Sequence, residues 1–240
     1  MKITRQTFLR ITGISAAMLA FRKVSAAFVP PRWGMAIDVT KCANEDNCTK
    51  CSAACRAAHN IPQVPDARHD IRWLWKEPFN RALPNETDQY SSLATESVMV
   101  MCNHCDNPAC VRVCPTQATF KREDGIVAMD YHRCIGCRYC MAACPYGSRS
   151  FNFQDPRPYI ANPTADFPTR TKGVVEKCNF CSERLGSGRQ PACVEACPEK
   201  ALTFGNLNDP QSPIRQLLAS RRHIRRKPEL GTEPKVFYIV

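Results

Sequence analysis

The stretch Cys134-Ile-Gly-Cys-Arg-Tyr-Cys-Met-Ala-Ala-Cys-Pro145 decides the fold of this chain of 240 residues. Its spacing is C-x2-C-x2-C-x3-C-P, and two other groups of cysteines end in the same C-x3-C-P, at Cys114-Pro115 and Cys197-Pro198. The sequence holds 16 cysteines, which fall into four sets of four with none left over. Set one is Cys42, Cys48, Cys51 and Cys55; set two is Cys102, Cys105, Cys110 and Cys114; set three is Cys134, Cys137, Cys140 and Cys144; set four is Cys178, Cys181, Cys193 and Cys197.

The spacing of set three is the run that binds a pair of [4Fe–4S] clusters, with its fourth cysteine ligating the other cluster of the pair. Four such sets imply two pairs and up to four [4Fe–4S] clusters. The other three sets contain longer gaps, each of which lengthens a loop without removing a ligand. Set one, interrupted by residues 43–47, leaves the count at three or four clusters. The chain is therefore predicted to move electrons.

Two other interpretations of the cysteines stay open at this point. Cysteines two or three residues apart on a tight loop point toward a common centre, and a disulfide framework would make no use of that geometry. A chain of this length can also bury a core without such crosslinks. Structural zinc suits paired C-x2-C elements, but zinc sites usually take two ligands from each of two such elements. Three cysteines within seven residues plus a fourth beyond them, as in set three, favour a cluster.

The basic charge of the chain does not indicate a nucleic-acid partner. The formal charge is +11, of which residues 1–27 contribute +5 and residues 28–240 the remaining +6. Each oxidised cluster with its four thiolates adds roughly −2, so four clusters bring the holoprotein close to neutral. We therefore expect no nucleic-acid partner.

Residues 1–27 have the layout of a signal peptide. A basic start precedes an apolar stretch from Ile11 to Phe21, and small residues follow at Ser25-Ala26-Ala27. Thr4-Arg-Gln-Thr-Phe-Leu-Arg10 resembles the twin-arginine export signal, with Gln6 in place of its second arginine. That route exports folded proteins, which suits clusters assembled in the cytoplasm. An uncleaved amphipathic anchor or a disordered leader is the alternative.

The chain is predicted to have an α+β fold of two bacterial (2[4Fe–4S]) ferredoxin-like modules, one inserted in the other. Between sets two and three, residues 118–129 indicate a strand, a turn at Asp124-Gly125 and a second strand. Further strands are expected at residues 34–38, before set one, and at residues 201–204, after set four. The module made by sets two and three would then lie inside the module made by sets one and four.

The remaining segments are expected to be mostly irregular. Residues 56–96 and 150–172 are rich in proline and polar residues and favour long loops that cover clusters or meet partners. The tail is predicted to hold a helix at 214–220, a basic run at 221–227 and a strand at 236–240. The basic run is either a solvated face or a contact for an acidic partner or anionic lipid. The predicted organisation is a signal peptide (1–27), the first part of the outer module (33–96), the inserted module (97–150), the second part of the outer module (151–205) and a basic tail (206–240).

No catalytic site is predicted. His104 and His132 sit beside cluster cysteines, where ordinary hydrogen bonding around a ligand is the expected role. Trp73 and Trp75 are expected to be packing residues. The sequence contains no nucleophile–base pair and no nucleotide-binding fingerprint.

Several stretches carry a resemblance to a known family. Met101-Cys-Asn-His-Cys-Asp-Asn-Pro-Ala-Cys-Val-Arg-Val-Cys-Pro115 resembles the four-cluster electron-transfer subunits of the DMSO reductase, polysulfide reductase and formate-dependent nitrite reductase (NrfC) group. Within that group, residues 124–137, 167–178 and 225–231 are similar to the DsrO-type iron–sulfur subunits of DsrMKJOP (Hdr-like menaquinol oxidoreductase) complexes.

The resemblance implies a ligand set for each cluster, because sets one and four pair in this family, as do sets two and three. The first cluster would take Cys42, Cys48, Cys51 and Cys197, and the second Cys55, Cys178, Cys181 and Cys193. The third would take Cys102, Cys105, Cys110 and Cys144, and the fourth Cys114, Cys134, Cys137 and Cys140.

The resemblance also implies partners and a location. The partners would be an NrfD-type quinone-interacting membrane subunit, a multihaem cytochrome c and the other subunits of a DsrMKJOP-like complex. The chain would sit peripherally on the extracytoplasmic (periplasmic) face of the cytoplasmic membrane, and carry electrons between menaquinone and dissimilatory sulfur metabolism. A molybdopterin oxidoreductase is the alternative assembly, and a zinc-holding structural subunit the third.

Overall fold

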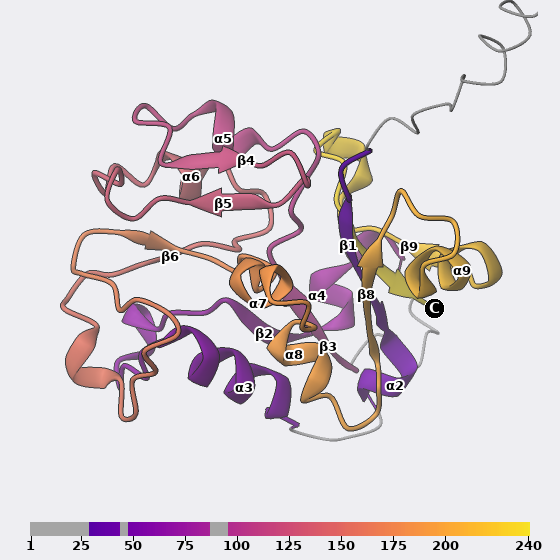
Figure 1. The fold of residues 1–240 in the computed structure, drawn as a ribbon, viewed down its shortest axis with the longest axis horizontal. Helices are drawn as coiled ribbons and strands as arrows, with labels where there is room; N and C mark the ends of the chain where they lie inside the picture. Colours follow the sequence, from indigo (N-terminus) through magenta and orange to yellow (C-terminus); the bar gives the residue numbers. More distant parts are fainter. Residues whose placement is uncertain (1–28, 44–47, 87–95) are drawn as a thin grey trace, which may run out of the picture. The chain divides into compact units, whose positions relative to one another are not determined.

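Strands from the two ends of the described chain form the centre of the largest sheet (Figure 1). The structure is a computed structural model and describes residues 29–43, 48–86 and 96–240. β1 (Trp33–Asp38) pairs in parallel with β10 (Val236–Ile239) and antiparallel with β8 (Leu202–Asn206). β9 (His223–Ile224) completes the order β8-β1-β10-β9. The strands predicted at 34–38, 201–204 and 236–240 are confirmed.

Both faces of β1 are covered, since its residues after Trp33 are all buried. Successive side chains of a strand point to opposite faces. Met35 and Ile37 accordingly belong to the main core, whereas Ala36 packs with Ile214 of α9 (Pro213–Ser220) in a second cluster. The helix predicted at 214–220 is therefore confirmed, and it closes the side of the sheet opposite the main core.

A short hairpin with two short helices forms a separate group at the upper left of Figure 1. β4 (Thr119–Lys121) pairs antiparallel with β5 (Val127–Met129). The turn between them contains Gly125 at φ +78°, a conformation that glycine adopts without steric cost. α5 (Ala109–Arg112) and α6 (Tyr139–Ala142) flank this hairpin in sequence. The predicted strand–turn–strand is thus confirmed.

The connection 56–96 is more regular than predicted. It contains β2 (Leu74–Pro78), which pairs antiparallel with β3 (Ser97–Met101), and the short helix α4 (Phe79–Ala82). Val98 to Met101 are all buried in the main core. Residues 87–95 separate β2 from its partner β3 in the sequence, so no short turn motif indicates that the two strands pair. The packing role predicted for the tryptophans is confirmed, because Trp73 lies in the core and Trp75 packs against it.

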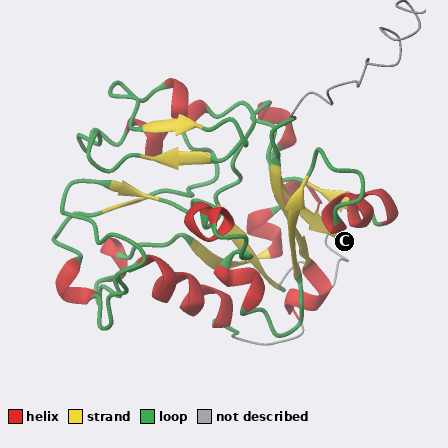
Figure 2. Cartoon of the chain, in the orientation of Figure 1, coloured by secondary structure: helices red, strands yellow, loops and turns green. Residues whose placement is uncertain are grey.

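Long loops join the remaining short elements, as Figure 2 shows. These elements are α2 (Val39–Ala43), α3 (Lys50–His59), β6 (Ser150–Phe151), β7 (Val175–Glu176), α7 (Ser182–Gly186), α8 (Ala192–Glu195) and the 3-10 helices Ala67–His69, Pro84–Glu86, Arg157–Tyr159 and Pro228–Leu230. α3 packs on α8, and this contact brings sets one and four together. Residues 31–240 form one compact unit. The predicted signal peptide lies outside the described residues.

The basic run at 221–227 is divided between internal and external positions. Arg226 is buried, donates to the carbonyl of Ala82 and lies 3.5 Å from Glu77. The Lys227 ammonium donates to the carbonyl of Pro145 at 2.8 Å. Arg226 and Lys227 therefore stabilise the fold through contacts with segments distant in the sequence. Among the described residues, no helix has the length and apolar character needed to cross a bilayer.

Candidate metal centres

The tight cysteine loops of sets two, three and four each contain a residue with positive φ. His104 (φ +42°) lies between Cys102 and Cys105, and Phe180 (φ +55°) occupies the corresponding place between Cys178 and Cys181. Left-handed residues turn the backbone sharply, so the flanking side chains converge on one side of the loop. Backbone N–H groups also approach the sulfurs, such as that of Phe180, 3.4 Å from Cys178 Sγ.

The sixteen cysteines meet in four groups, which we call centres 1 to 4. The cysteines of centres 1, 3 and 4 each line a separate cavity, and the cysteines of centre 2 are buried close to one another. Centre 1 is Cys42, Cys48, Cys51 and Cys197; centre 2 is Cys55, Cys178, Cys181 and Cys193; centre 3 is Cys102, Cys105, Cys110 and Cys144; centre 4 is Cys114, Cys134, Cys137 and Cys140. These groups have the composition that the family resemblance implied.

The thiols of one centre disfavour one another's ionisation. Burial raises the pKa of Cys51 to about 11, and the neighbouring Cys42 and Cys48 of centre 1 act in the same direction. At centre 2, burial raises the pKa of Cys55 well above its usual value, and Cys178 is the first of the thiols that add to this effect. Four thiolates can share such a place only with a positively charged group among them. The donor set therefore fits an iron–sulfur cluster.

The short helices explain why the fourth cysteine of a set joins a different centre. α5 contains Cys110 and ends at Arg112, so Cys114 lies beyond the helix and is followed by Pro115, which cannot continue it. Cys110 lines the cavity of centre 3 and Cys114 that of centre 4. In α3, by contrast, Cys51 and Cys55 are one helical turn apart and reach centres 1 and 2 along the same helix face.

The four centres follow one another in a row. Cys193 of centre 2 is affected by the charge of Cys51 of centre 1. Cys178 of centre 2 is affected most, after burial, by Cys102 of centre 3. Cys140 of centre 4 is affected by the charge of Cys110 of centre 3, although burial and Arg149 have larger effects. The spatial order is therefore 1–2–3–4, with centres 2 and 3 in the middle.

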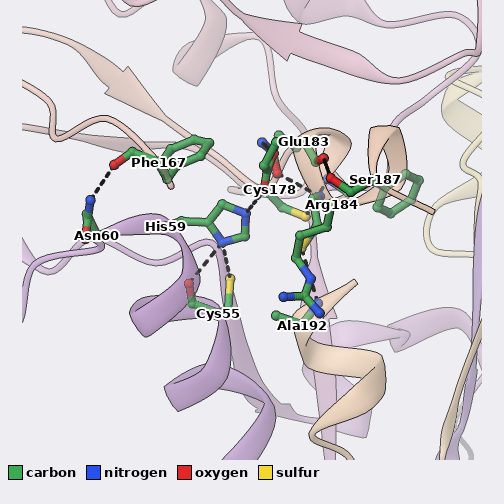
Figure 3. A network of polar contacts seen from close by, with 12 residues as sticks. Cys55, His59, Asn60, Phe167, Cys178, Glu183, Arg184, Ser187 and Ala192 are labelled. Atoms are coloured by element: carbon green, nitrogen blue, oxygen red, sulfur yellow. Dashed lines mark hydrogen bonds and ion pairs between the residues drawn. The ribbon is translucent and has the colours of Figure 1, made fainter. Parts of the chain in front are cut away.

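His59 contacts centre 2, a role that was not predicted from the sequence (Figure 3). Its ring is buried, with Nε2 2.8 Å from Glu183 Oε1 and Nδ1 3.0 Å from the Cys55 carbonyl. Burial lowers the pKa of His59, but hydrogen bonds to Cys181 and Glu183 outweigh it and raise the pKa to about 9. His59, Cys181 and Glu183 could together hold a single ion. Cys181 belongs to centre 2, so we interpret His59 and Glu183 as hydrogen-bonding groups around that centre.

Of the two histidines singled out from the sequence, one is structural and the other lies at the surface. His104 is buried, accepts a hydrogen bond from the Val127 N–H at 3.1 Å and stacks on Phe180 with ring centroids 3.7 Å apart. The two rings come from the loops of centres 3 and 2, so this stack joins the two halves of the row. His132 is exposed, and its backbone N–H donates to Asp130.

A relative that matches almost the whole chain identifies the family. The "Hdr-like menaquinol oxidoreductase iron-sulfur subunit 1" of Archaeoglobus fulgidus is 40% identical over 98% of this chain and 97% of its own length. The protein belongs to this family of iron–sulfur electron-transfer subunits. Two family models, each described as a 4Fe-4S dicluster domain, match residues 94–157 and 126–198.

Two further relatives match most of the chain at similar identity. The "Menaquinone reductase, iron-sulfur cluster-binding subunit" of Nitratidesulfovibrio vulgaris is 39% identical over 87% of this chain and 88% of its own length. The "Protein NrfC homolog" of Haemophilus influenzae is 38% identical over 95% of this chain and 92% of its own length. The family resemblance predicted from the sequence is thereby confirmed. Two dicluster domains and 16 cysteines fit four [4Fe–4S] clusters.

Gly136, inside the set-three loop, should not tolerate a side chain. Its φ is +71°, and a Cβ there would lie 2.5 Å from the carbonyl oxygen of Gly173. We expect Gly136→Ala to destabilise the protein and to deplete centre 4, because the backbone at Gly136 cannot move away without displacing the adjacent Cys137. Gly147→Ala is the matched control, since Gly147 has φ +62° but no atom within 4 Å of its added Cβ.

Gly147→Ala should lower the free energy of unfolding by about 1 kcal/mol, which is the cost of placing an alanine in the left-handed conformation. Thermal unfolding and cluster content of the purified holoprotein measure both effects. Equal losses in the two variants would contradict the proposed clash.

Proposed function

We propose that this chain is the electron-transfer subunit of a membrane-bound respiratory complex that links menaquinone to dissimilatory sulfur metabolism. The row of four cysteine centres is the observation that carries the proposal. A [4Fe–4S] cluster accepts and passes on single electrons at a potential set by its surroundings. The residues of the chain supply the thiolates, exclude water from the middle of the row and hold the four centres in fixed positions.

The proposed ligand sets are the four centres. Centres 1 and 2 would form the outer module, made of residues 33–96 and 151–205, and centres 3 and 4 the inserted module, residues 97–150. The dicluster models begin after set one, so centre 1 is supported by the shared cavity of its cysteines and by the chain-length relative. The region from 206 to 240 would complete the outer module, because β10 pairs with β1.

The surface around centre 4 supports a partner contact at that end of the row. Cys137 is exposed, and its neighbours Ile135 and Tyr139 are 67% and 63% exposed. Apolar side chains gathered beside an exposed redox centre are typical of a surface that another protein covers. Burial there would bring centre 4 close to the partner and keep water away from it.

The proposed partners are an NrfD-type quinone-interacting membrane subunit, a multihaem cytochrome c and the remaining subunits of a DsrMKJOP-like complex. The name of the Archaeoglobus fulgidus relative, a menaquinol oxidoreductase subunit, supports this assignment. We further propose that residues 1–27 direct export and that the chain lies peripherally on the periplasmic face of the membrane. The basic and apolar layout of those residues supports the export step.

A molybdopterin oxidoreductase is the second candidate assembly. Relatives named as subunits of DMSO, selenate and tetrathionate reductases match the chain at 35% to 38% identity and support it. The same row of centres would serve either complex, so the difference lies in the partners.

Isolation of the intact complex from membranes tests the proposal. We expect a quinone-interacting membrane subunit and c-type haem to co-purify with this chain, and protease added to spheroplasts to digest it. Recovery with a molybdopterin subunit and without haem would establish the second candidate instead. Protection of the chain in spheroplasts, with digestion in inverted vesicles, would overturn the periplasmic location.

A further inference from the structure

Arg149 is a buried cation between centres 3 and 4. It follows Cys144 by five residues, precedes β6 and is 5% exposed. Its Nη1 donates to Thr119 Oγ1 at 3.0 Å and lies 3.3 Å from Met129 Sδ. Both of these partners belong to the β4–β5 hairpin of the inserted module. The guanidinium is thus fixed on one side by neutral groups.

The other buried cations of the described chain have partners that Arg149 lacks. Arg170 lies 2.7 Å from Glu176, Lys235 lies 3.2 Å from Asp106, and Arg226 lies near Glu77. Lys177 has no carboxylate but donates to two backbone carbonyls. None of the ion pairs among the described residues involves Arg149, and its buried Nη2 has no hydrogen-bond partner of oxygen or nitrogen.

A buried charge without a counter-charge is strongly unfavourable. Arg149 lines the cavity of centre 3 together with Cys102 and Cys110, and no carboxylate is among the described residues that line it. Cys140 of centre 4 is also close enough to interact with its charge. The missing counter-charge must therefore be the thiolates of these two centres and whatever they bind.

We propose that Arg149 is the shared counter-charge of centres 3 and 4 and that its free N–H groups hydrogen-bond sulfur at centre 3. Reduction adds a negative charge to a centre, and a buried cation favours that charge. Arg149 therefore holds the reduction potentials of both centres above the values they would otherwise have. It lets the inserted module accept electrons more readily than its thiolates alone would allow.

Potentiometric titration of the full-length holoprotein, followed by EPR, tests the proposal. In Arg149→Met we expect the ratio of reduced to oxidised centre at a fixed potential to fall about tenfold at centres 3 and 4, which is 59 mV for a one-electron couple. Centres 1 and 2 should change less than twofold. Arg149→Lys keeps the charge and should show a smaller shift than Arg149→Met.

Arg112→Met is the matched control. Arg112 lies two residues after Cys110 of centre 3, but it is exposed and is not among the described residues that line either cavity, so water screens its charge and its loss should change the ratio less than twofold. Unchanged potentials in both Arg149 variants with all centres present, or equal shifts at all four centres, would overturn the proposal. Loss of centre 3 in Arg149→Met alone would support a need for the charge. Its loss in Arg149→Lys as well would overturn the proposal and make Arg149 a structural residue only.

The inference rests on the proposed ligand sets of centres 3 and 4. Its failure is distinguishable from failure of the proposed function, because the titration measures potentials in the isolated subunit whereas the function is tested by the subunits that co-purify.

Discussion

Cys55→Ala should remove centre 2 while leaving centre 1 intact, although Cys55 belongs by sequence to set one. The Cys55 side chain is buried among Cys178, Cys181 and Cys193, not beside Cys42 and Cys48. α3 accounts for this, since four residues along a helix advance about 6 Å and carry Cys51 and Cys55 to successive centres. The number of [4Fe–4S] clusters per chain, counted by EPR and Mössbauer spectroscopy, should fall from about four to about three.

Double replacements make this prediction decisive. Cys55→Ala combined with Cys178→Ala should still leave three [4Fe–4S] clusters, because both residues serve one centre and their effects are not additive. Cys55→Ala combined with Cys51→Ala should leave two, because these residues serve different centres. The reverse pattern would mean that set one forms a cluster by itself and that the modules do not exchange ligands.

The sequence was most informative where structure is local. The regular spacing from Cys134 to Cys144 indicated a ferredoxin-like module, and the turn residues Asp124-Gly125 between two strand-like segments indicated the hairpin beside it. The strands at 34–38 and 236–240 were also predicted from the sequence. Their parallel pairing was not, because about 200 residues separate them and no short motif specifies a partner so distant.

The groups that surround the centres were harder to predict. His59 was missed, although it lies four residues after Cys55 in one helix and therefore on the same face. That spacing was the available indication. Arg149 lies in a loop, where an arginine is ordinarily exposed, and only the tertiary structure shows its burial between two centres. His132 lay beside a cysteine in sequence, yet its side chain is exposed at the surface.

Replacing one partner of a buried ion pair should have the largest effect on stability. Arg170 and Glu176 are 1% and 0% exposed and lie 2.7 Å apart. Glu176 also accepts hydrogen bonds from Trp73 Nε1 at 3.0 Å and Asn152 Nδ2 at 2.6 Å. Glu176→Gln leaves the guanidinium buried without a counter-charge, which typically costs about 3–5 kcal/mol. For a chain of this size, the Tm of the holoprotein should fall on the order of 10 °C.

Two further variants distinguish the loss of a buried counter-charge from the effect of replacing any paired carboxylate. Asp155→Asn breaks an exposed pair with Arg157 and should leave the Tm nearly unchanged, since water screens that pair. Arg170→Met with Glu176→Gln removes both charges and should be less destabilised than Glu176→Gln alone; a larger loss would contradict the charge argument.

Because Arg170 also donates to the carbonyl of Asn60 at the end of α3, the pair ties β7 to the helix that carries Cys51 and Cys55. On heating Glu176→Gln, centres 1 and 2 should therefore be lost before centre 4, an order that EPR of partly unfolded samples can follow.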